Sequence, residues 1–77
     1  MKMLKDELDK LNIHWWDETV NRLTLCFEHN HTRFSVADMD IIPYYAYEFR
    51  NDTDNKMIGK FFTIRQVVDY IKENVLG

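Results

Sequence analysis

The sequence contains very little cysteine, proline or glycine. Of its 77 residues, one is cysteine, one is proline and two are glycine. A lone Cys26 excludes a disulfide bond within the chain, so any core must form without a covalent cross-link. Two isolated glycines cannot build a glycine-rich phosphate loop, which excludes the common nucleotide-binding motifs.

Long hydrophobic runs and basic clusters are also absent. No apolar stretch approaches the roughly 20 residues of a membrane span, and the first seven residues turn acidic before a signal-peptide core forms. The net charge of −3 argues against direct nucleic-acid binding, which requires clustered Lys and Arg. We therefore expect one cytoplasmic domain, residues 1–77, that does not contact membranes.

Helical patterns stand at both ends of the sequence. Thr63 and Gln66 form a capping-box signature at the start of the C-terminal helix. An apolar stripe follows at Ile64, Val67, Val68, Ile71 and Val75. In the N-terminal segment, helical spacing of apolar residues ends near Asn12 and comprises Met1, Leu4, Leu8 and Leu11.

In the middle of the chain, apolar and polar residues alternate as they do in half-buried strands. The alternation predicts strands at residues 19–28, 31–37, 44–50 and 57–62, with a turn at His29-Asn30 and a bulge at Gly59. Ile13 and Trp15 share one face of a short extended segment. Pro43 predicts a loop between the second and third of the predicted strands.

This order of elements predicts an α+β fold with two layers. An antiparallel meander of three or four strands carries the N- and C-terminal helices on one face, in the order α-β-β-β-β-α. The other face is left partly open to water, and we expect the function to lie there.

The candidate metal sites in the sequence lack residues that a metal site requires. His29 and His31 supply two ligands where zinc needs three or four. The segment that begins at Asp52 resembles a calcium loop but has Met57 in place of the required glycine. Cys26 lacks an adjacent base or an electropositive setting, so we interpret it as an inert thiol. We predict no metal, no cofactor and no catalytic residues.

Aromatic and acidic side chains are the remaining features of the sequence that indicate a function. Adjacent rings in an extended segment point to opposite faces, so some rings must lie on the open face or at an edge of the sheet. Large rings are enriched at binding hot spots. Carboxylates outnumber basic residues in the middle of the chain. An acidic surface formed by them would be electrostatically complementary to a basic partner. The predicted partner-binding residues are Trp15, Trp16, Asp38, Asp40, Tyr44, Glu48, Asp52 and Asp54.

The chain resembles small accessory proteins encoded by bacteriophages and mobile elements. This group includes inhibitors of host defence such as anti-CRISPR proteins. The resemblance lies in small size, acidic and aromatic-rich composition, and the layout that ends in Lys60-Phe61-Phe62-Thr63-Ile64-Arg65-Gln66-Val67-Val68-Asp69-Tyr70-Ile71-Lys72. It implies a phage-encoded inhibitor acting in the host cytoplasm and carries over no site residues.

Two functions of different classes follow from the sequence. The first is a non-enzymatic protein that masks or inhibits a protein partner, such as a basic nucleic-acid-binding protein. The second is a binding protein that sequesters a small molecule or nucleotide, with Tyr or Trp rings stacking a base and Arg33 or Arg50 holding a phosphate. Homodimerisation through an open sheet edge is compatible with both.

Overall fold

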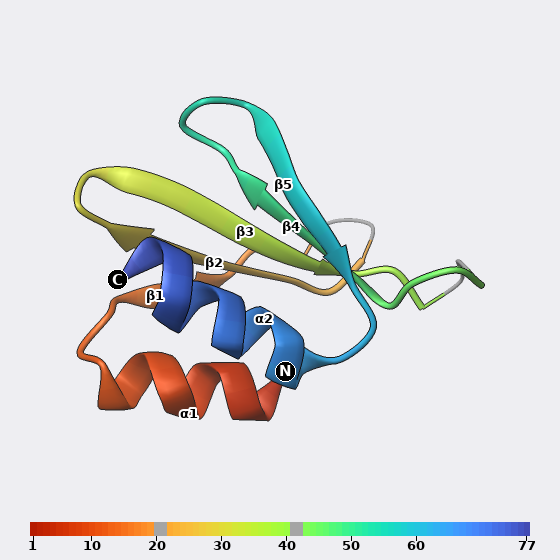
Figure 1. Cartoon of the computed structure of the whole chain (residues 1–77), viewed down its shortest axis with the longest axis horizontal. Coiled ribbons are helices and arrows are strands. Elements are labelled where there is room, and N and C mark those ends of the chain that lie inside the picture. The colour runs from red at the N-terminus through yellow and green to blue at the C-terminus, as the bar shows by residue number, and fades with distance from the viewer. Residues whose placement is uncertain (20–21, 41–42) are drawn as a thin grey trace.

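Two helices cover one face of a five-stranded antiparallel sheet (Figure 1). The structure is a computed structural model that describes residues 1–19, 22–40 and 43–77. Both helices lie below the sheet in Figure 1, and nothing in the described chain covers its other face. The predicted two-layer α+β fold with an open face is therefore confirmed.

Each helix ends or begins with the hydrogen bonds that its sequence predicts. Helix α1 (Lys2–Lys10) ends in a Schellman motif, in which Ile13 N–H donates to Leu8 O and Asn12 N–H to Asp9 O, with Asn12 at φ 60°. Helix α2 (Ile64–Tyr70) begins with the predicted capping box. Gln66 N–H donates to Thr63 Oγ1 at 3.2 Å, and Thr63 N–H donates back to Gln66 Oε1 at 3.2 Å. A π-helical turn, η1 (Ile71–Val75), continues α2.

The strands follow one another across the sheet in chain order. They are β1 (Trp15–Asp17), β2 (Thr24–His29), β3 (Thr32–Asp38), β4 (Tyr47–Asn51) and β5 (Lys56–Phe61). A two-residue turn joins β2 to β3, with Asn30 at φ 50° and His31 at φ 62°. It lies one residue later than the predicted turn at His29-Asn30, because His29 still pairs with Thr32. Positive φ at both central residues is the type I′ pattern, whose twist matches that of the flanking strands.

The core lies between the helices and the inward face of the sheet. Phe27, Phe34 and Phe49 stack on neighbouring strands, with ring centroids 5.1 to 6.0 Å apart. Helix residues Leu4, Leu8, Val67, Val68 and Ile71 pack onto the same cluster. Each such side chain stabilises the fold by about 1.5–3 kcal/mol relative to its exposed state. Three members of the predicted C-terminal stripe, Val67, Val68 and Ile71, thus belong to the core, and the other two, Ile64 and Val75, pack against it.

The sheet has one strand more than the sequence predicted. Trp15, Trp16 and Asp17 pair with Phe27, Cys26 and Leu25 and form β1. The strand predicted at residues 19–28 starts later than predicted, because β2 begins at Thr24 and Thr19, Arg22 and Leu23 are not in a strand. Val20 and Asn21 lie outside the described residues. Three residues are too short for an alternation pattern to register, which is why β1 was not predicted.

The third predicted strand starts later than its pattern indicated. The predicted range was residues 44–50, whereas β4 is Tyr47–Asn51. Pro43 and Tyr44 occupy a turn, and the ladder resumes where Ala46 N–H donates to Phe61 O at 3.0 Å. Tyr47 and Phe49 face the helices, where Phe49 is part of the core and Tyr47 packs against it. Ile41 and Ile42 of the predicted loop lie outside the described residues.

The bulge predicted at Gly59 is confirmed. Phe49 pairs with Gly59 and Arg50 with Met57, so Ile58 is the extra residue of β5. A Cβ atom on Gly59 would stand 3.0 Å from Cε2 of Phe61. The missing side chain therefore lets the Phe61 ring lie over this position and reach Phe49 and Tyr70.

Removing the capping hydroxyl tests whether α2 depends on this motif. We expect Thr63→Ala to lower the free energy of unfolding by about 1 kcal/mol and the melting temperature by about 4–8 °C, because Gln66 N–H loses its acceptor. Thr63→Ser keeps the hydroxyl and is the matched control. Equal melting temperatures for the alanine variant and the wild type in calorimetry would refute this role.

Candidate binding surface on the open face of the sheet

The open face carries three rows of side chains that run across the strands. The register gives one row of Trp16, Cys26, Ser35, Arg50 and Met57. A second row holds Thr24, Ala37, Glu48 and Lys60, and Glu18 joins it where its N–H donates to Thr24 O. The third contains His14, Glu28, Arg33 and Asp52, joined by backbone bonds at its ends. The face therefore mixes aromatic, acidic and basic groups.

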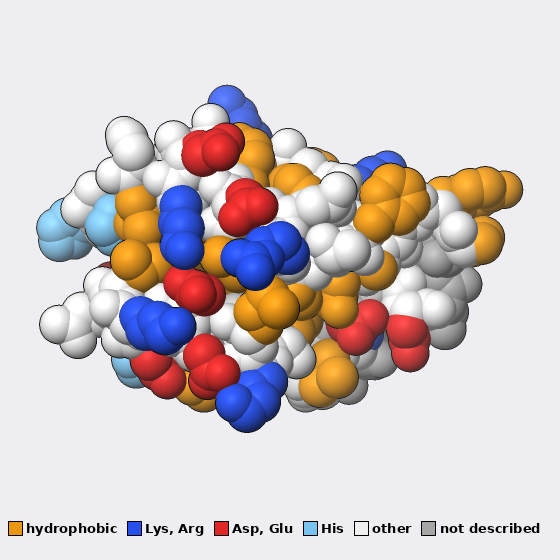
Figure 2. Space-filling model, turned by 60° about the horizontal axis from the view of Figure 1, so that its bottom comes forward, with side chains coloured by type: hydrophobic (Ala, Val, Ile, Leu, Met, Phe, Trp, Pro, Cys, Tyr) orange, Lys and Arg blue, Asp and Glu red, His pale blue; other side chains and the backbone are white. Residues whose placement is uncertain are grey.

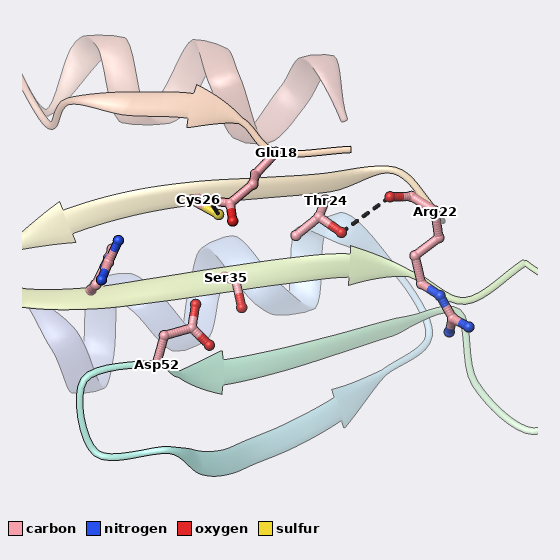
Figure 3. A pocket seen from close by; sticks show the side chains of 7 residues that line it. Glu18, Arg22, Thr24, Cys26, Ser35 and Asp52 are labelled. Carbon is pink, nitrogen blue, oxygen red and sulfur yellow. Dashed lines mark hydrogen bonds between the residues drawn. The ribbon is translucent and has the colours of Figure 1, made fainter. Parts of the chain in front are cut away.

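A hollow of about 460 Å³ lies in the middle of this face (Figure 3). Its lining consists of Glu18, Arg22, Thr24, Cys26, Arg33, Ser35 and Asp52. The hollow exists because β2 and β3 present small side chains to this side at four neighbouring positions, namely Thr24, Cys26, Ser35 and Ala37. Larger side chains surround these positions: Arg33 on β3, and Glu18, Arg22 and Asp52 in the flanking segments. Its volume falls in the range of about 300–1,000 Å³ that is usual for ligand sites.

Glu18 organises one wall of the hollow. Its Oε2 accepts hydrogen bonds from the Trp16 indole Nε1 at 3.2 Å and from the Cys26 thiol at 3.5 Å. The Trp16 ring also stacks on His14, with centroids 5.5 Å apart. One carboxylate thus fixes a half-buried ring beside the hollow and satisfies the thiol on its floor.

The Cys26 thiol is held in its protonated form. Only 3% of the residue is exposed, and burial raises its pKa from 9.0 to about 12, with further contributions from the hydrogen bond to Glu18 and the charges of Glu18 and Asp52. Arg33 acts in the opposite direction. This environment is the opposite of the electropositive one that activates a nucleophilic cysteine.

The structure separates the two tryptophans of the predicted site. Trp16 lies on the open face. Trp15 lies on the helix side, where its indole donates to Asp9 Oδ1 at 2.8 Å and the Lys5 ammonium stands 5.0 Å from its ring. Trp15 thus joins α1 to the sheet and is not part of the open face.

Glu48 and Asp52 lie on the open face, whereas Asp54 belongs to a turn. Glu48 accepts a hydrogen bond from the Tyr45 hydroxyl, and the Tyr45 ring lies under the Lys60 ammonium at 4.9 Å. Asp52 lines the hollow from the turn between β4 and β5. Asp54 accepts from Asn51 Nδ2 at 3.2 Å within the same turn, so it stabilises the local conformation.

The remaining predicted residues, Asp38, Asp40 and Tyr44, gather at one end of the sheet. The loop between β3 and β4 projects there, and Tyr44 is 78% exposed. Leu23 and Phe62, which are 58% and 67% exposed, lie at the same end because β2 starts there and β5 ends there. Figure 2, a view of the helix side, shows hydrophobic side chains at this end and intermingled charges over α1. This loop end is a second exposed surface. It adjoins the hollow at Arg22, which lines the hollow and also borders a recess with Leu23, Asp38 and Asp40.

Sequence reasoning missed Glu18, Arg22, Thr24 and Ser35 as lining residues. A signal for the hollow was present, since two neighbouring strands alternate small residues with large apolar ones. Reading that signal requires the register that places Cys26 opposite Ser35. In residues 1–19, 22–40 and 43–77, no group of three or more His, Cys, Asp or Glu side chains is arranged to hold a metal ion.

Comparisons with family models, curated proteins and solved structures return no match to this chain. None of the helices in the described parts of the chain has the length and apolar character needed to cross a membrane.

The raised pKa predicts an unreactive native thiol. At pH 8 a group with a pKa near 12 is thiolate in only about 1 molecule in 10,000, so we expect a disulfide reagent to label native Cys26 on the order of a thousandfold more slowly than the unfolded chain. Absorbance of the released thiolate measures both rates. Equal rates in buffer and in denaturant would show that the thiol is accessible and ionisable.

The same shift predicts a loss of stability in alkali. The unfolded thiol ionises above about pH 9 while the folded thiol keeps its proton to about pH 12, so the stabilising effect is complete below pH 9 and fades between these values. We expect the wild type to lose more unfolding free energy than Cys26→Ala over this interval. Denaturant titrations of both proteins at pH 8 and pH 10.5 test the difference.

Proposed function

We propose that this protein is a non-enzymatic binding protein that masks or inhibits a protein partner through the open face of its sheet. The observation that supports this proposal most directly is the hollow, which lies beside the half-buried Trp16 ring. Hot spots of protein interfaces commonly combine an aromatic anchor with a pocket that excludes water.

The charges of the open face indicate what kind of partner surface fits. Glu18, Glu28, Glu48 and Asp52 alternate with Arg22, Arg33, Arg50 and Lys60. Among the described residues, the ion pairs all involve α1, so these open-face groups form no salt bridge with one another, although several of them contact neighbouring polar or aromatic side chains. A partner with charges of both signs complements them better than a uniformly basic nucleic-acid channel does. If the partner is a basic nucleic-acid-binding protein, Asp38 and Asp40 at the loop end are the better candidates to meet it.

A cytoplasmic inhibitor of host defence, of the anti-CRISPR type, is the biological setting that we propose. It rests on the resemblance in size, composition and layout. The acidic net charge of −3 and the exposed rings are compatible with competition for a protein surface.

Two open-face variants and one loop-end variant test the surface. We expect Trp16→Ala and Ser35→Tyr to weaken partner binding about tenfold or more, because the first removes the ring and the second fills the hollow. Tyr44→Ala, at the loop end, is the control and is expected to bind normally. Binding is measured by calorimetry with a partner first captured by the wild type, after circular dichroism shows that each variant is folded.

A different pattern would overturn the assignment to the open face. If Tyr44→Ala abolishes binding while both open-face variants retain it, the loop end is the binding surface. If no protein is captured from host lysate under any condition, the proposed function itself fails.

The second candidate is sequestration of a small anionic molecule such as a nucleotide. The size of the hollow and the presence of Arg22 and Arg33 in its lining favour it. A ligand that binds only the native state raises the melting temperature. We expect nucleotides to produce no rise, because the carboxylates of Glu18 and Asp52 repel phosphate; a rise that is lost in Arg33→Gln would instead support the second candidate.

A further inference from the structure

We propose that the hollow on the open face receives a single arginine side chain of the protein partner, with the guanidinium group between Glu18 and Asp52. This inference rests on the proposed function and specifies what the partner presents to the site.

The positions of the two carboxylates are the first argument. Glu18 follows β1, and Asp52 stands in the turn after β4. Figure 3 shows their side chains on opposite sides of the floor formed by Cys26 and Ser35, with both carboxylates turned toward that floor. Neither carboxylate takes part in an ion pair among the described residues. Two carboxylates that face one space bind a cation with several N–H donors well.

The charges around the thiol agree with a cation site. Burial is the largest cause of the raised pKa of Cys26; the hydrogen bond to Glu18 and the charges of Glu18 and Asp52 raise it further, and the charge of Arg33 opposes them. The carboxylates therefore disfavour a further negative charge at the floor, whereas burial disfavours an unpaired ion of either sign.

The two carboxylates favour a guanidinium over an ammonium group. A planar guanidinium carries five N–H donors in a fixed fork and can donate to two carboxylates at once, which a compact ammonium group does less well. The Trp16 ring is not part of the lining, but its hydrogen bond to Glu18 helps to hold one carboxylate in place. Ser35, at 8% exposure, contributes a hydroxyl at the floor that can accept a further N–H.

The two arginines of the lining limit how many positive charges enter. Arg33 lies in the row of Glu28 and Asp52, and Figure 3 places the Arg22 guanidinium beyond Thr24 at the far end of the hollow. They repel a run of consecutive basic residues while leaving the space between the carboxylates to one cation. The site thus suits an isolated arginine and not a polybasic segment.

Titration of the full chain with a model arginine tests the site directly. The probe is N-acetyl-arginine N-methylamide, and its neutral isostere, the citrulline analogue, is the ligand control. In ¹⁵N-edited NMR spectra, the Trp16 indole N–H signal reports on Glu18, while the Trp15 indole, bonded to Asp9, is an internal reference on the other face. We expect a saturable shift of the Trp16 signal with the arginine probe and none with citrulline.

Isosteric variants connect the shift to the carboxylates. We expect Glu18→Gln and Asp52→Asn each to weaken the apparent affinity for the probe about tenfold, because a charged acceptor is lost. Glu28→Gln, on the same face but outside the hollow, is expected to leave it unchanged. Absence of a saturable shift, an equal response to citrulline, or full affinity in both variants would overturn the proposal.

This experiment separates the present inference from the proposed function. If the partner requires Trp16 and Ser35 but the arginine probe fails to bind, the inference is wrong and the proposed function stands. If the probe binds as expected but Trp16→Ala and Ser35→Tyr leave partner binding intact, the open face is not the partner surface and both proposals fall.

Discussion

Burial on one side of the sheet is the constraint on which the rest of this structure depends. The rings of Phe27, Phe34 and Phe49 stand on three adjacent strands and point to the same side. Since side chains alternate along a strand, packing these rings under the helices commits the intervening residues to the other face. A slip of one residue in any central strand would expose a phenylalanine and bury a charge. The register that buries these phenylalanines therefore also determines which side chains lie on the open face.

The elements that the sequence predicted correctly are those with strong local signals. The capping box at Thr63, the helix end near Asn12 and the bulge at Gly59 each depend on a few neighbouring residues whose conformational preferences agree. The alternation at residues 19–28 and 31–37 correctly indicated β2 and β3, whereas the three-residue β1 is too short for a pattern to be recognised. The late start of β4 has a different cause, since the turn at Pro43 and Tyr44 delays the ladder although the residues alternate.

The candidate site could be predicted only in part, because it depends on contacts between distant segments. Adjacent tryptophans had to point to opposite faces, but which of them would be open depended on the pairing of Trp16 with Cys26. The hollow brings together residue 18, strands β2 and β3, and Asp52, and no local pattern specifies that arrangement. The acidic excess of residues 28–54 likewise divided between the open face and the loop end. The acidic residues of this segment therefore do not form one continuous surface.

The small side chains that line the hollow are difficult to explain by stability alone. Central strands favour β-branched and aromatic residues, because these fill the pleated surface and pack against cross-strand neighbours. Here the central open-face positions include Cys26, Ser35 and Ala37, although the inward positions of the same strands carry phenylalanine, leucine and valine. A domain of 77 residues has little stability to spare, and larger residues at these positions would bury additional apolar area. A recess with carboxylates on two sides, kept where larger residues would add stability, is therefore the feature of this fold that supports the proposed binding function.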